Sequence, residues 1–429
     1  MGTKTVLVIA KIFPPAGGAG VQRTAKFVKY LPHFGWEPIV LTPNRITSPM
    51  RDDSLLRDIP PNTRIIRTFT LEPMEEARRI SAFYFLYGAL RVLSIPDLSI
   101  WWVPWGIWHG YRELRRKAVD AIYVTGSPFS SYFIGVALKK LTGIPLVVDF
   151  RDGWTLDPNY NFWWVLRWRN PTIERLMQDA VVRYADKLIV AHPGVRDIFM
   201  QRYGAEKAFV TILNGYDPDD FRVQARKHLE RDRLNIVYTG KLWPLTSRPD
   251  ALLRGVKRVL EEDADIRKDL SITFVGNLDR HSQALIRELG LERWVRTVGY
   301  LPHLESVEHL LEADVLLLIV NHCEFHIPGK IYEYITARKP VLALVTPNGE
   351  AARLLKKAGS EIWADPQDVL DIRDKLRLLH RRWKDNDLDI EVNSEFIETL
   401  SRKRQTGLLA SVLDEVASSS SPQDRLRRD

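Results

Sequence analysis

The chain has 429 residues, of which 45% are hydrophobic and 27% are charged. This length is enough for two globular domains of ordinary size, each with its own core. The single cysteine, Cys323, excludes an intrachain disulfide and suggests a reducing compartment. No stretch reaches the ~18 apolar residues of a membrane span, and the start of the chain is predicted to be a strand rather than a signal peptide. We therefore expect a cytoplasmic protein.

A net charge of +8 indicates an anionic partner: nucleic acid, an anionic membrane or a phosphorylated substrate. No nucleic acid partner is expected, because the sequence contains no helix-turn-helix, zinc-finger or RNA-binding signature. Tryptophan beside basic residues is typical of a membrane–water interface, although most single tryptophans belong to a core. Eight of the thirteen tryptophans fall between positions 101 and 168 of the sequence, near basic residues; they are Trp101, Trp102, Trp105, Trp108, Trp154, Trp163, Trp164 and Trp168. The pattern predicts peripheral contact with an anionic membrane, on the inner face of the plasma membrane.

The first strand, predicted at Val6–Ala10, leads into a glycine-rich turn and then a helix at Val21–Leu31. This arrangement forms a cradle for a phosphate or another oxyanion. A dinucleotide-binding dehydrogenase would carry G-x-G-x-x-G here and an acid after the second strand, Pro38–Leu41. Arg23 instead occupies the place of the third glycine, and the second strand leads into Thr42-Pro43-Asn44. NAD is therefore not expected.

An amphipathic helix is predicted at Ile80–Leu93, after which the alternation of strands and helices resumes. The strand at Pro145–Phe150 leads into Arg151-Asp152-Gly153-Trp154. Ligands of open α/β sheets bind at the carboxyl ends of strands, where Asp152 and Arg151 would orient or deprotonate an acceptor hydroxyl. A structural ion pair between the two is the alternative.

A segment dense in turn formers, Asn214–Asp219, is predicted to link two domains. Its Asp217 and Asp219 form an Asp-x-Asp pair, for which we favour a structural role over metal binding. The second half repeats the α/β pattern, with predicted strands at residues 235–239, 271–275 and 295–298, each followed by glycine. A final helix is predicted at Phe396–Val416, followed by a disordered tail at residues 418–429.

The segment Val315–Val345 carries the clearest functional pattern in the chain. A buried strand at Val315–Val320 is followed by a polar loop and a helix that Pro328-Gly329-Lys330 begins. Backbone N–H groups and the helix dipole favour an anion there, Gly329 permits close approach, and Lys330 adds a full charge. Glu333, one turn later, is placed to accept hydrogen bonds from two sugar hydroxyls. An ordinary strand–helix unit with a surface lysine and glutamate fits this pattern equally well.

Five stretches resemble, in order, motifs of the family-4 retaining glycosyltransferases (group 1): FPPAGGAGVQR at Phe13–Arg23, DFRDGW at Asp149–Trp154, NGYD at Asn214–Asp217, YTGKL at Tyr238–Leu242 and PGKIYEY at Pro328–Tyr334. The resemblance implies the α/β GT-B fold, in which two Rossmann-like parallel-sheet domains face each other across a cleft. Residues 1–213 would form the acceptor-side domain, to which the final helix crosses back, and residues 214–395 would bind the nucleotide sugar. The donor would be a UDP- or GDP-linked sugar, transferred with retention, without a cofactor or an essential metal.

The resemblance also implies roles for single residues. Glu333 matches the ribose-binding glutamate, and Lys241 matches a base that contacts the donor diphosphate. The usual second base falls at Thr246, so Arg248 is taken in its place. The predicted donor-binding set is Gly18, Gly20, Gly240, Lys241, Arg248, Gly299, Gly329, Lys330 and Glu333. The predicted acceptor-side set is Arg151, Asp152 and Trp154, and the predicted catalytic set is Asp152, Lys241 and Glu324.

One departure from the family concerns the donor sugar. The family commonly pairs two glutamates eight positions apart, and the first of them touches this sugar. Phe325 stands eight positions before Glu333, and Glu324 stands nine before it. The sequence leaves open which of the two takes that position.

The expected reaction is transfer of a sugar to a saccharide or lipid-linked saccharide, as in bacterial relatives that build cell-surface polysaccharides. One alternative is a nucleotide-sugar epimerase of the same fold. Another is a catalytically silent, membrane-associated partner in polysaccharide assembly. The donor base, the sugar, the acceptor, the linkage and the oligomeric state are not fixed by the sequence.

Overall fold

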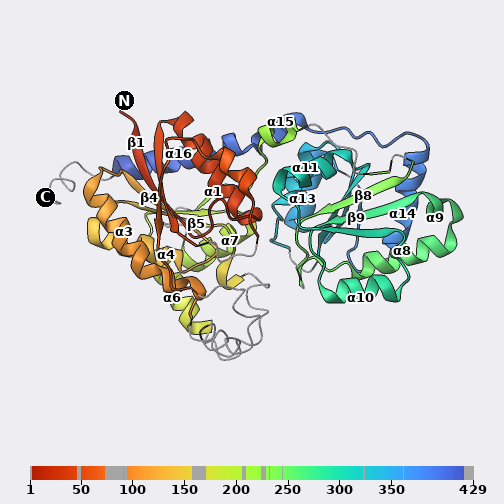
Figure 1. The fold of residues 1–429 in the computed structure, drawn as a ribbon, viewed down its shortest axis with the longest axis horizontal. Coiled ribbons are helices and arrows are strands. Elements are labelled where there is room, and N and C mark those ends of the chain that lie inside the picture. The colour runs from red at the N-terminus through yellow and green to blue at the C-terminus, as the bar shows by residue number, and fades with distance from the viewer. Residues whose placement is uncertain are drawn as a thin grey trace. The chain divides into compact units, whose positions relative to one another are not determined.

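The protein consists of two compact units, shown in a computed structural model (Figure 1). The first unit comprises Met1–Asn214 and Arg402–Asp429, and the second comprises Gly215–Ser401, so the chain passes between them within the turn-rich segment Asn214–Asp219. The structure describes residues 2–45, 50–72, 90, 94–156, 171–204, 209–223, 229–230, 232–243, 245–321, 324–360 and 362–419. Among these residues, no helix has both the length and the apolar character needed to cross a bilayer.

The first unit contains a seven-stranded parallel sheet in the order β3-β2-β1-β4-β5-β6-β7. Its strands are β1 (Lys4–Ala10), β2 (Trp36–Pro43), β3 (Arg64–Thr68), β4 (Ala121–Gly126), β5 (Leu146–Phe150), β6 (Lys187–Val190) and β7 (Phe209–Thr211). The central strands are apolar on both faces, as expected of a parallel sheet covered on both sides.

Helices cover both faces of this sheet. Val6 and Val8 of β1 pack with side chains of α1 (Ala19–Tyr30) and α16 (Arg402–Ser419), whereas Leu7 and Ile9 pack on the opposite face. That face is covered by α4 (Ser131–Thr142), α6 (Pro171–Tyr184) and α7 (Pro193–Tyr203), and α3 (Val103–Arg116) packs on α4. Short helices occur at η1 (Leu31–Phe34), η2 (Asp53–Asp58), η4 (Leu98–Trp102) and η5 (Trp154–Leu156). The last helix of the chain thus belongs to the core of the first unit.

The second unit contains a six-stranded parallel sheet in the order β10-β9-β8-β11-β12-β13. The strands are β8 (Leu234–Thr239), β9 (Leu270–Val275), β10 (Val295–Gly299), β11 (Val315–Val320), β12 (Val341–Val345) and β13 (Trp363–Ala364). One face is covered by α8 (Asp250–Glu262), α10 (Arg280–Glu288) and α14 (Val369–Lys384). The remaining helices are η7 (Pro218–Arg222), α9 (Ala264–Asp269), α11 (His303–Glu312), α12 (Lys330–Thr336), α13 (Glu350–Ala358) and α15 (Ser394–Thr399).

The structure differs from the sequence prediction at two elements, and two further predicted segments lie largely outside the described residues. The final helix predicted at Phe396–Val416 is two helices, α15 in the second unit and α16 in the first. No strand was predicted from the sequence in the region of β3, because RIIRT is a half-exposed edge strand without an apolar run. The helix predicted at Ile80–Leu93 lies outside the described residues except for Leu90, and the tail lies outside them from residue 420.

Candidate functional site

The second unit has a topological switch point between β8 and β11. From β8 the chain proceeds outward through β9 and β10, and from β11 it proceeds in the opposite direction through β12 and β13. Ligands of open α/β sheets bind at the carboxyl ends of the strands at such a point. Gly240 and Lys241 directly follow β8, and the segment after β11 leads to α12, which begins at Lys330. The fold therefore brings two parts of the predicted donor set to the same edge.

The side chain of Lys330 lies against the end of β8. Its Nζ is 3.5 Å from the centroid of the Tyr238 ring, and a Cβ built on Gly240 would lie 3.5 Å from this Nζ. Desolvation lowers the pKa of Lys330 well below its usual value, and the nearby Glu333 carboxylate raises it again in part. An anion bound beside this lysine would stabilise its charged form and so offset the cost of desolvation.

Glycines line the edge next to this lysine. Gly240 has a φ of 93°, and Gly276, which follows β9, has a φ of 144°. A Cβ on Gly276 would collide with the carbonyl oxygen of Gly240, so only glycine lets the two backbones pass. Gly299 closes the row at the end of β10 with a φ of 77°. Gly276 was not in the predicted set, although its position after a strand matches that of Gly240 and Gly299.

Lys241 is the second cation of the predicted site. Its Nζ is 4.0 Å from the centroid of the exposed Trp243 ring. Its backbone carbonyl accepts a hydrogen bond from the Tyr238 hydroxyl at 3.0 Å. The Tyr238 side chain thus contacts Lys330 with its ring and the Lys241 backbone with its hydroxyl, which fixes both lysine-bearing segments to one aromatic residue.

Glu333 is held close to a histidine that the sequence prediction missed. His303, the first residue of α11, has its Nδ1 3.9 Å from Glu333 Oε1 and its Nε2 2.9 Å from Asp220 Oδ2. All three side chains are largely buried, and that of Glu333 is 16% exposed. His303 is thus within ion-pair distance of Glu333, although the separation is too long for a hydrogen bond.

The segment after β11 is anchored by Asn321. Its backbone N–H donates to Thr246 O at 2.8 Å, and its side-chain Nδ2 donates to Arg248 O at 3.0 Å. The buried Asn321 Oδ1 has no hydrogen-bond partner among the described residues, so it offers an acceptor at the switch point. Further along, Glu324 and Phe325 are both exposed, and the Glu324 carbonyl accepts from Glu350 N at 2.8 Å.

Two predicted donor residues have other surroundings than expected. The Arg248 guanidinium donates to both carboxylate oxygens of Asp250, at 3.1 and 2.9 Å, and lies 2.6 Å from His281 Nε2. Although burial acts to raise the pKa of Asp250, the hydrogen bonds from His281 and Arg248 lower it. Arg248 is thus engaged on the surface of α8 rather than presented to a diphosphate. Gly329 has ordinary helical angles and no atom within 4 Å of a built Cβ, so the backbone does not require glycine there.

In the first unit, Arg151 links the first turn of α1 to the loop that follows β4. Its Nη1 donates to Gly20 O at 2.6 Å, and its Nη2 donates to Ser127 O at 2.8 Å. A Cβ on Gly20 would lie 2.8 Å from this guanidinium, so Gly20 makes room for Arg151. The Asp152 carboxylate is 3.5 Å from Arg151, a weak contact compared with those to the carbonyls. The predicted ion pair therefore contributes less than the contacts between arginine and backbone.

Two further motif residues of this unit have structural roles. Trp154, predicted on the acceptor side, is fully buried and stacks on Phe129 with centroids 4.8 Å apart, so its ring is not accessible to an acceptor. Arg23, in the place of the third glycine, donates to both oxygens of Asp149 at 2.8 and 3.0 Å, and both side chains are fully buried. Gly18 precedes α1 with a φ of 100°, a conformation that favours glycine.

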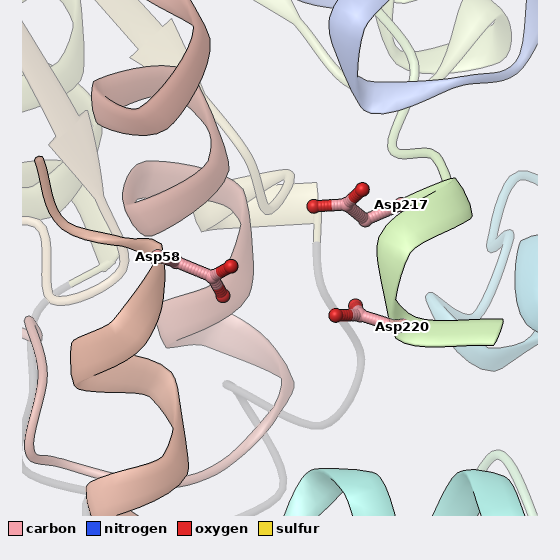
Figure 2. A group of neighbouring side chains, drawn as sticks. All are labelled: Asp58, Asp217 and Asp220. Carbon is pink, nitrogen blue, oxygen red and sulfur yellow. The ribbon is translucent and has the colours of Figure 1, made fainter. Parts of the chain in front are cut away.

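Three aspartates, Asp58, Asp217 and Asp220, each have a partner within their own unit. Figure 2 shows Asp58 at the end of η2 in the first unit and Asp217 and Asp220 at η7 in the second. Asp58 is 2.8 Å from Lys26 Nζ, Asp217 accepts from Asp219 N at 3.0 Å, and Asp220 contacts His303. Each carboxylate thus has a partner within its unit, and we assign no metal to them.

A hollow of about 650 Å³ lies near the ends of β12 and β13 and contains none of the predicted site residues. Its lining residues are Thr346, Pro347, Asp365, Pro366, Gln367, Asp368, Val369 and Leu370. The charged groups among them are carboxylates, which would repel a diphosphate. The switch point remains the better anion site.

Comparison with known proteins shows the family of the chain. The model of Glycosyltransferase Family 4 matches residues 16–220, and that of Glycosyl transferases group 1 matches residues 233–382. The chain belongs to the group 1 glycosyltransferases of family 4. The second match includes β8, β11 and α12, and with them Lys241, Lys330 and Glu333.

Individual relatives of this glycosyltransferase-family protein are distant. A D-inositol 3-phosphate glycosyltransferase of Streptosporangium roseum is 29% identical over 61% of the chain, and the match spans 60% of that relative. The structure of a glycosyltransferase from Rickettsia africae superposes with a TM-score of 0.64 at 14% identity, covering 98% of this chain and all of that one. Anabaena Alr3699/HepE in complex with UDP and glucose gives a TM-score of 0.60 at 14% identity, with 97% of each chain covered. These neighbours establish the predicted GT-B fold of two Rossmann-like domains.

Proposed function

We propose that the protein transfers a sugar from a nucleotide-sugar donor to a hydroxyl of an acceptor. The observation that carries the proposal is Lys330, a desolvated lysine at the start of a helix, beside Gly240 and Lys241 at the switch point. A diphosphate at this position would accept hydrogen bonds from backbone N–H groups and from lysine ammonium groups. Family membership agrees with this chemistry.

Roles for the remaining residues of the second unit follow from their surroundings. Glu333, which lies close to His303, would accept hydrogen bonds from the two ribose hydroxyls. Gly240 and Gly299 allow the nucleotide to approach the backbone closely. Glu324 is the candidate for contact with the donor sugar, since its carboxylate is exposed on the loop after β11. Arg248 is not included, because Asp250 and His281 hold its guanidinium.

The transfer breaks the bond between the anomeric carbon and the diphosphate oxygen, and the diphosphate leaves with the electron pair. The acceptor oxygen forms the new bond to the anomeric carbon and gives up its proton to the departing diphosphate oxygen. Lys330 and Lys241 would stabilise the charge that develops on the leaving group, usually the largest single contribution in such a site. Asp152 of the first unit is the candidate for orienting the acceptor hydroxyl. We propose retention of configuration and no essential metal.

For the donor we propose a UDP-linked sugar first and a GDP-linked sugar second, because the Anabaena neighbour was solved with UDP. The acceptor we propose is a saccharide or a lipid-linked saccharide in cell-surface polysaccharide synthesis. A second acceptor, D-inositol 3-phosphate, is favoured by the name of the Streptosporangium roseum relative.

The proposal is tested by incubating the purified protein with UDP- and GDP-sugars, with and without an acceptor panel that includes D-inositol 3-phosphate. We expect release of nucleoside diphosphate together with a new glycoside of the donor's anomeric configuration, only when an acceptor is present. Conversion of the donor without an acceptor would show an epimerase. A donor that binds but is never consumed would show a catalytically silent partner, and either result would overturn the proposal.

A further inference from the structure

The outward face of α3 in the first unit combines aromatic and basic side chains. Gly106 and Gly110 lie on the buried side of the helix and let it pack closely on Ile134 and Leu138 of α4. The opposite side therefore faces solvent, with Trp108 57% exposed. A single exposed tryptophan is not unusual, but a contiguous exposed patch of large apolar side chains indicates an interaction surface.

Neighbouring side chains extend this face into a ridge. Phe69 and Leu71 follow β3 and are both exposed, and the Phe69 ring packs edge-on against Trp105 with centroids 5.1 Å apart. We call the set an aromatic ridge; its members are Phe69, Leu71, Trp105, Trp108 and Tyr111.

Arginines border the aromatic ridge. The Arg45 guanidinium lies 5.8 Å from the Phe69 ring centroid, and that of Arg112 lies 5.8 Å from the Trp108 ring centroid. Arg115 and Arg116 are exposed in the last turn of α3. The single acid of this helix, Glu113, is buried and forms an ion pair with Arg64 at 2.6 Å. Positive charge thus dominates the exposed side of the helix.

The chemistry of this face fits the headgroup region of a bilayer. Tryptophan and tyrosine rings settle at the boundary between headgroups and acyl chains, while arginines bind the phosphates of anionic lipids. We propose that the aromatic ridge docks on a membrane that contains anionic lipids, with Trp108 among the headgroups.

The structure also narrows the sequence prediction of a membrane face. Trp102 and Trp154 are fully buried and cannot take part. Trp163, Trp164 and Trp168 lie outside the described residues. The proposed contact therefore depends on α3 and the segment after β3, and it stands independently of the proposed transfer reaction.

Co-sedimentation of the full-length protein with vesicles tests the proposal, using phosphatidylcholine with and without phosphatidylglycerol. We expect binding to the anionic vesicles only, weakening as salt is raised. Trp108→Ser should weaken the partition by about tenfold, from lost apolar burial. Arg112→Gln should weaken it by about fivefold, since each basic residue at an anionic surface contributes about 1 kcal/mol.

Matched controls are Leu141→Ser, an equally exposed apolar residue on α4, and Arg353→Gln on α13, and neither should change the partition. Equal binding of Trp108→Ser and wild type, equal binding to neutral and anionic vesicles, or no binding at low salt would overturn the proposal. Binding of the protein to RNA but not to vesicles, through the aromatic ridge, would also overturn the proposal. Nucleotide binding should be the same in all four variants, which separates this test from that of the proposed reaction.

Discussion

The two sheets are wound in the same way, yet the cations near their switch points have different partners. In the first unit, Arg23 forms a two-point ion pair with buried Asp149, and Lys11 lies 2.7 Å from the Glu72 carboxylate. In the second unit, Lys330 lies over the Tyr238 ring, and its pKa is lowered by desolvation. Carboxylates neutralise Arg23 and Lys11 in the first unit, whereas Lys330 in the second faces an aromatic ring.

This difference in partners indicates which cations stabilise the fold and which bind a ligand. A buried cation paired with a carboxylate is compensated in the folded protein, and removing it leaves an unpaired buried charge. A lysine over a ring gains only ~0.5–2 kcal/mol from the contact, so a phosphate would add to its stabilisation. Near the first switch point Arg23 and Lys11 stabilise the fold, and at the second Lys330 is placed to bind a ligand.

The largest effect is expected from Arg23→Met. The variant leaves the Asp149 carboxylate buried without its partner, which should destabilise the first unit by ~3–5 kcal/mol. The unfolding midpoint of the first unit in urea measures this loss, and nucleotide binding by the second unit should persist. Arg196→Met is the control, because it breaks an exposed pair with Asp197 worth at most ~1 kcal/mol. A stable Arg23→Met protein would contradict the comparison.

Lys330→Met should reduce transfer by ~10²–10³, because it removes a donor aimed at the leaving group. The pKa of Lys330 is lower in the folded chain than in the unfolded chain, so the folded protein binds fewer protons. The stability of the wild type should therefore rise with pH from the folded pKa up to the unfolded value, near ~10.4.

Removing the desolvated charge should leave the Lys330→Met variant at least as stable as the wild type at low pH, and the gap should shrink as pH rises. Melting temperatures across this pH range measure the gap. Lys356→Met, at an exposed position on α13, should change neither property. A loss of stability that is equal at every pH, with donor binding intact, would show that Lys330 is purely structural.

Glu333→Gln should weaken nucleotide binding by ~10- to 100-fold, since hydrogen bonds to a charged acceptor contribute ~1.5–3 kcal/mol. Calorimetry with UDP and 2′-deoxy-UDP measures the contribution of the ribose hydroxyl directly. The wild type should prefer UDP, and the variant should lose most of this preference. The exposed Glu305→Gln on α11 serves as the control. An unchanged preference for UDP in Glu333→Gln would show that Glu333 does not bind the ribose hydroxyls.

The smallest effect is expected from Arg248→Ala. Its guanidinium is engaged by Asp250, and exposed pairs of this kind contribute ~0–1 kcal/mol. Donor affinity should therefore change by no more than about twofold in a titration with UDP. A loss of donor affinity as large as that caused by Lys330→Met would show that Arg248 contacts the diphosphate and that its side chain moves on binding.

The sequence predicted the buried strands well, because fully apolar runs such as Val315–Val320 have few other solutions in a chain of this composition. It missed α3, where prolines, glycines and tryptophans obscure the helical period. It also missed Gly276, His303 and Asn321. Their importance arises from contacts between segments distant in sequence, such as that of Gly276 with Gly240.

Two predicted site residues have partners that their positions in a motif do not reveal. Arg248 follows the correct strand, yet Asp250 lies two positions later and binds its guanidinium. Trp154 ends a predicted acceptor motif, yet its ring fits into the core beside Phe129. Lys330 and Glu333 were predicted from their positions in one helix, and the structure adds Tyr238 and His303 as their neighbours.

The central claim is that a nucleoside diphosphate binds at the carboxyl ends of β8 and β11, against Lys330. Thermal unfolding of the wild type and of Lys330→Met with UDP, GDP and UDP-sugars tests it most directly, because a ligand in excess raises stability by mass action. We predict that at least one of these nucleotides raises the melting temperature of the wild type and has little effect on Lys330→Met. No shift with any nucleotide, or equal shifts in both proteins, would contradict the claim.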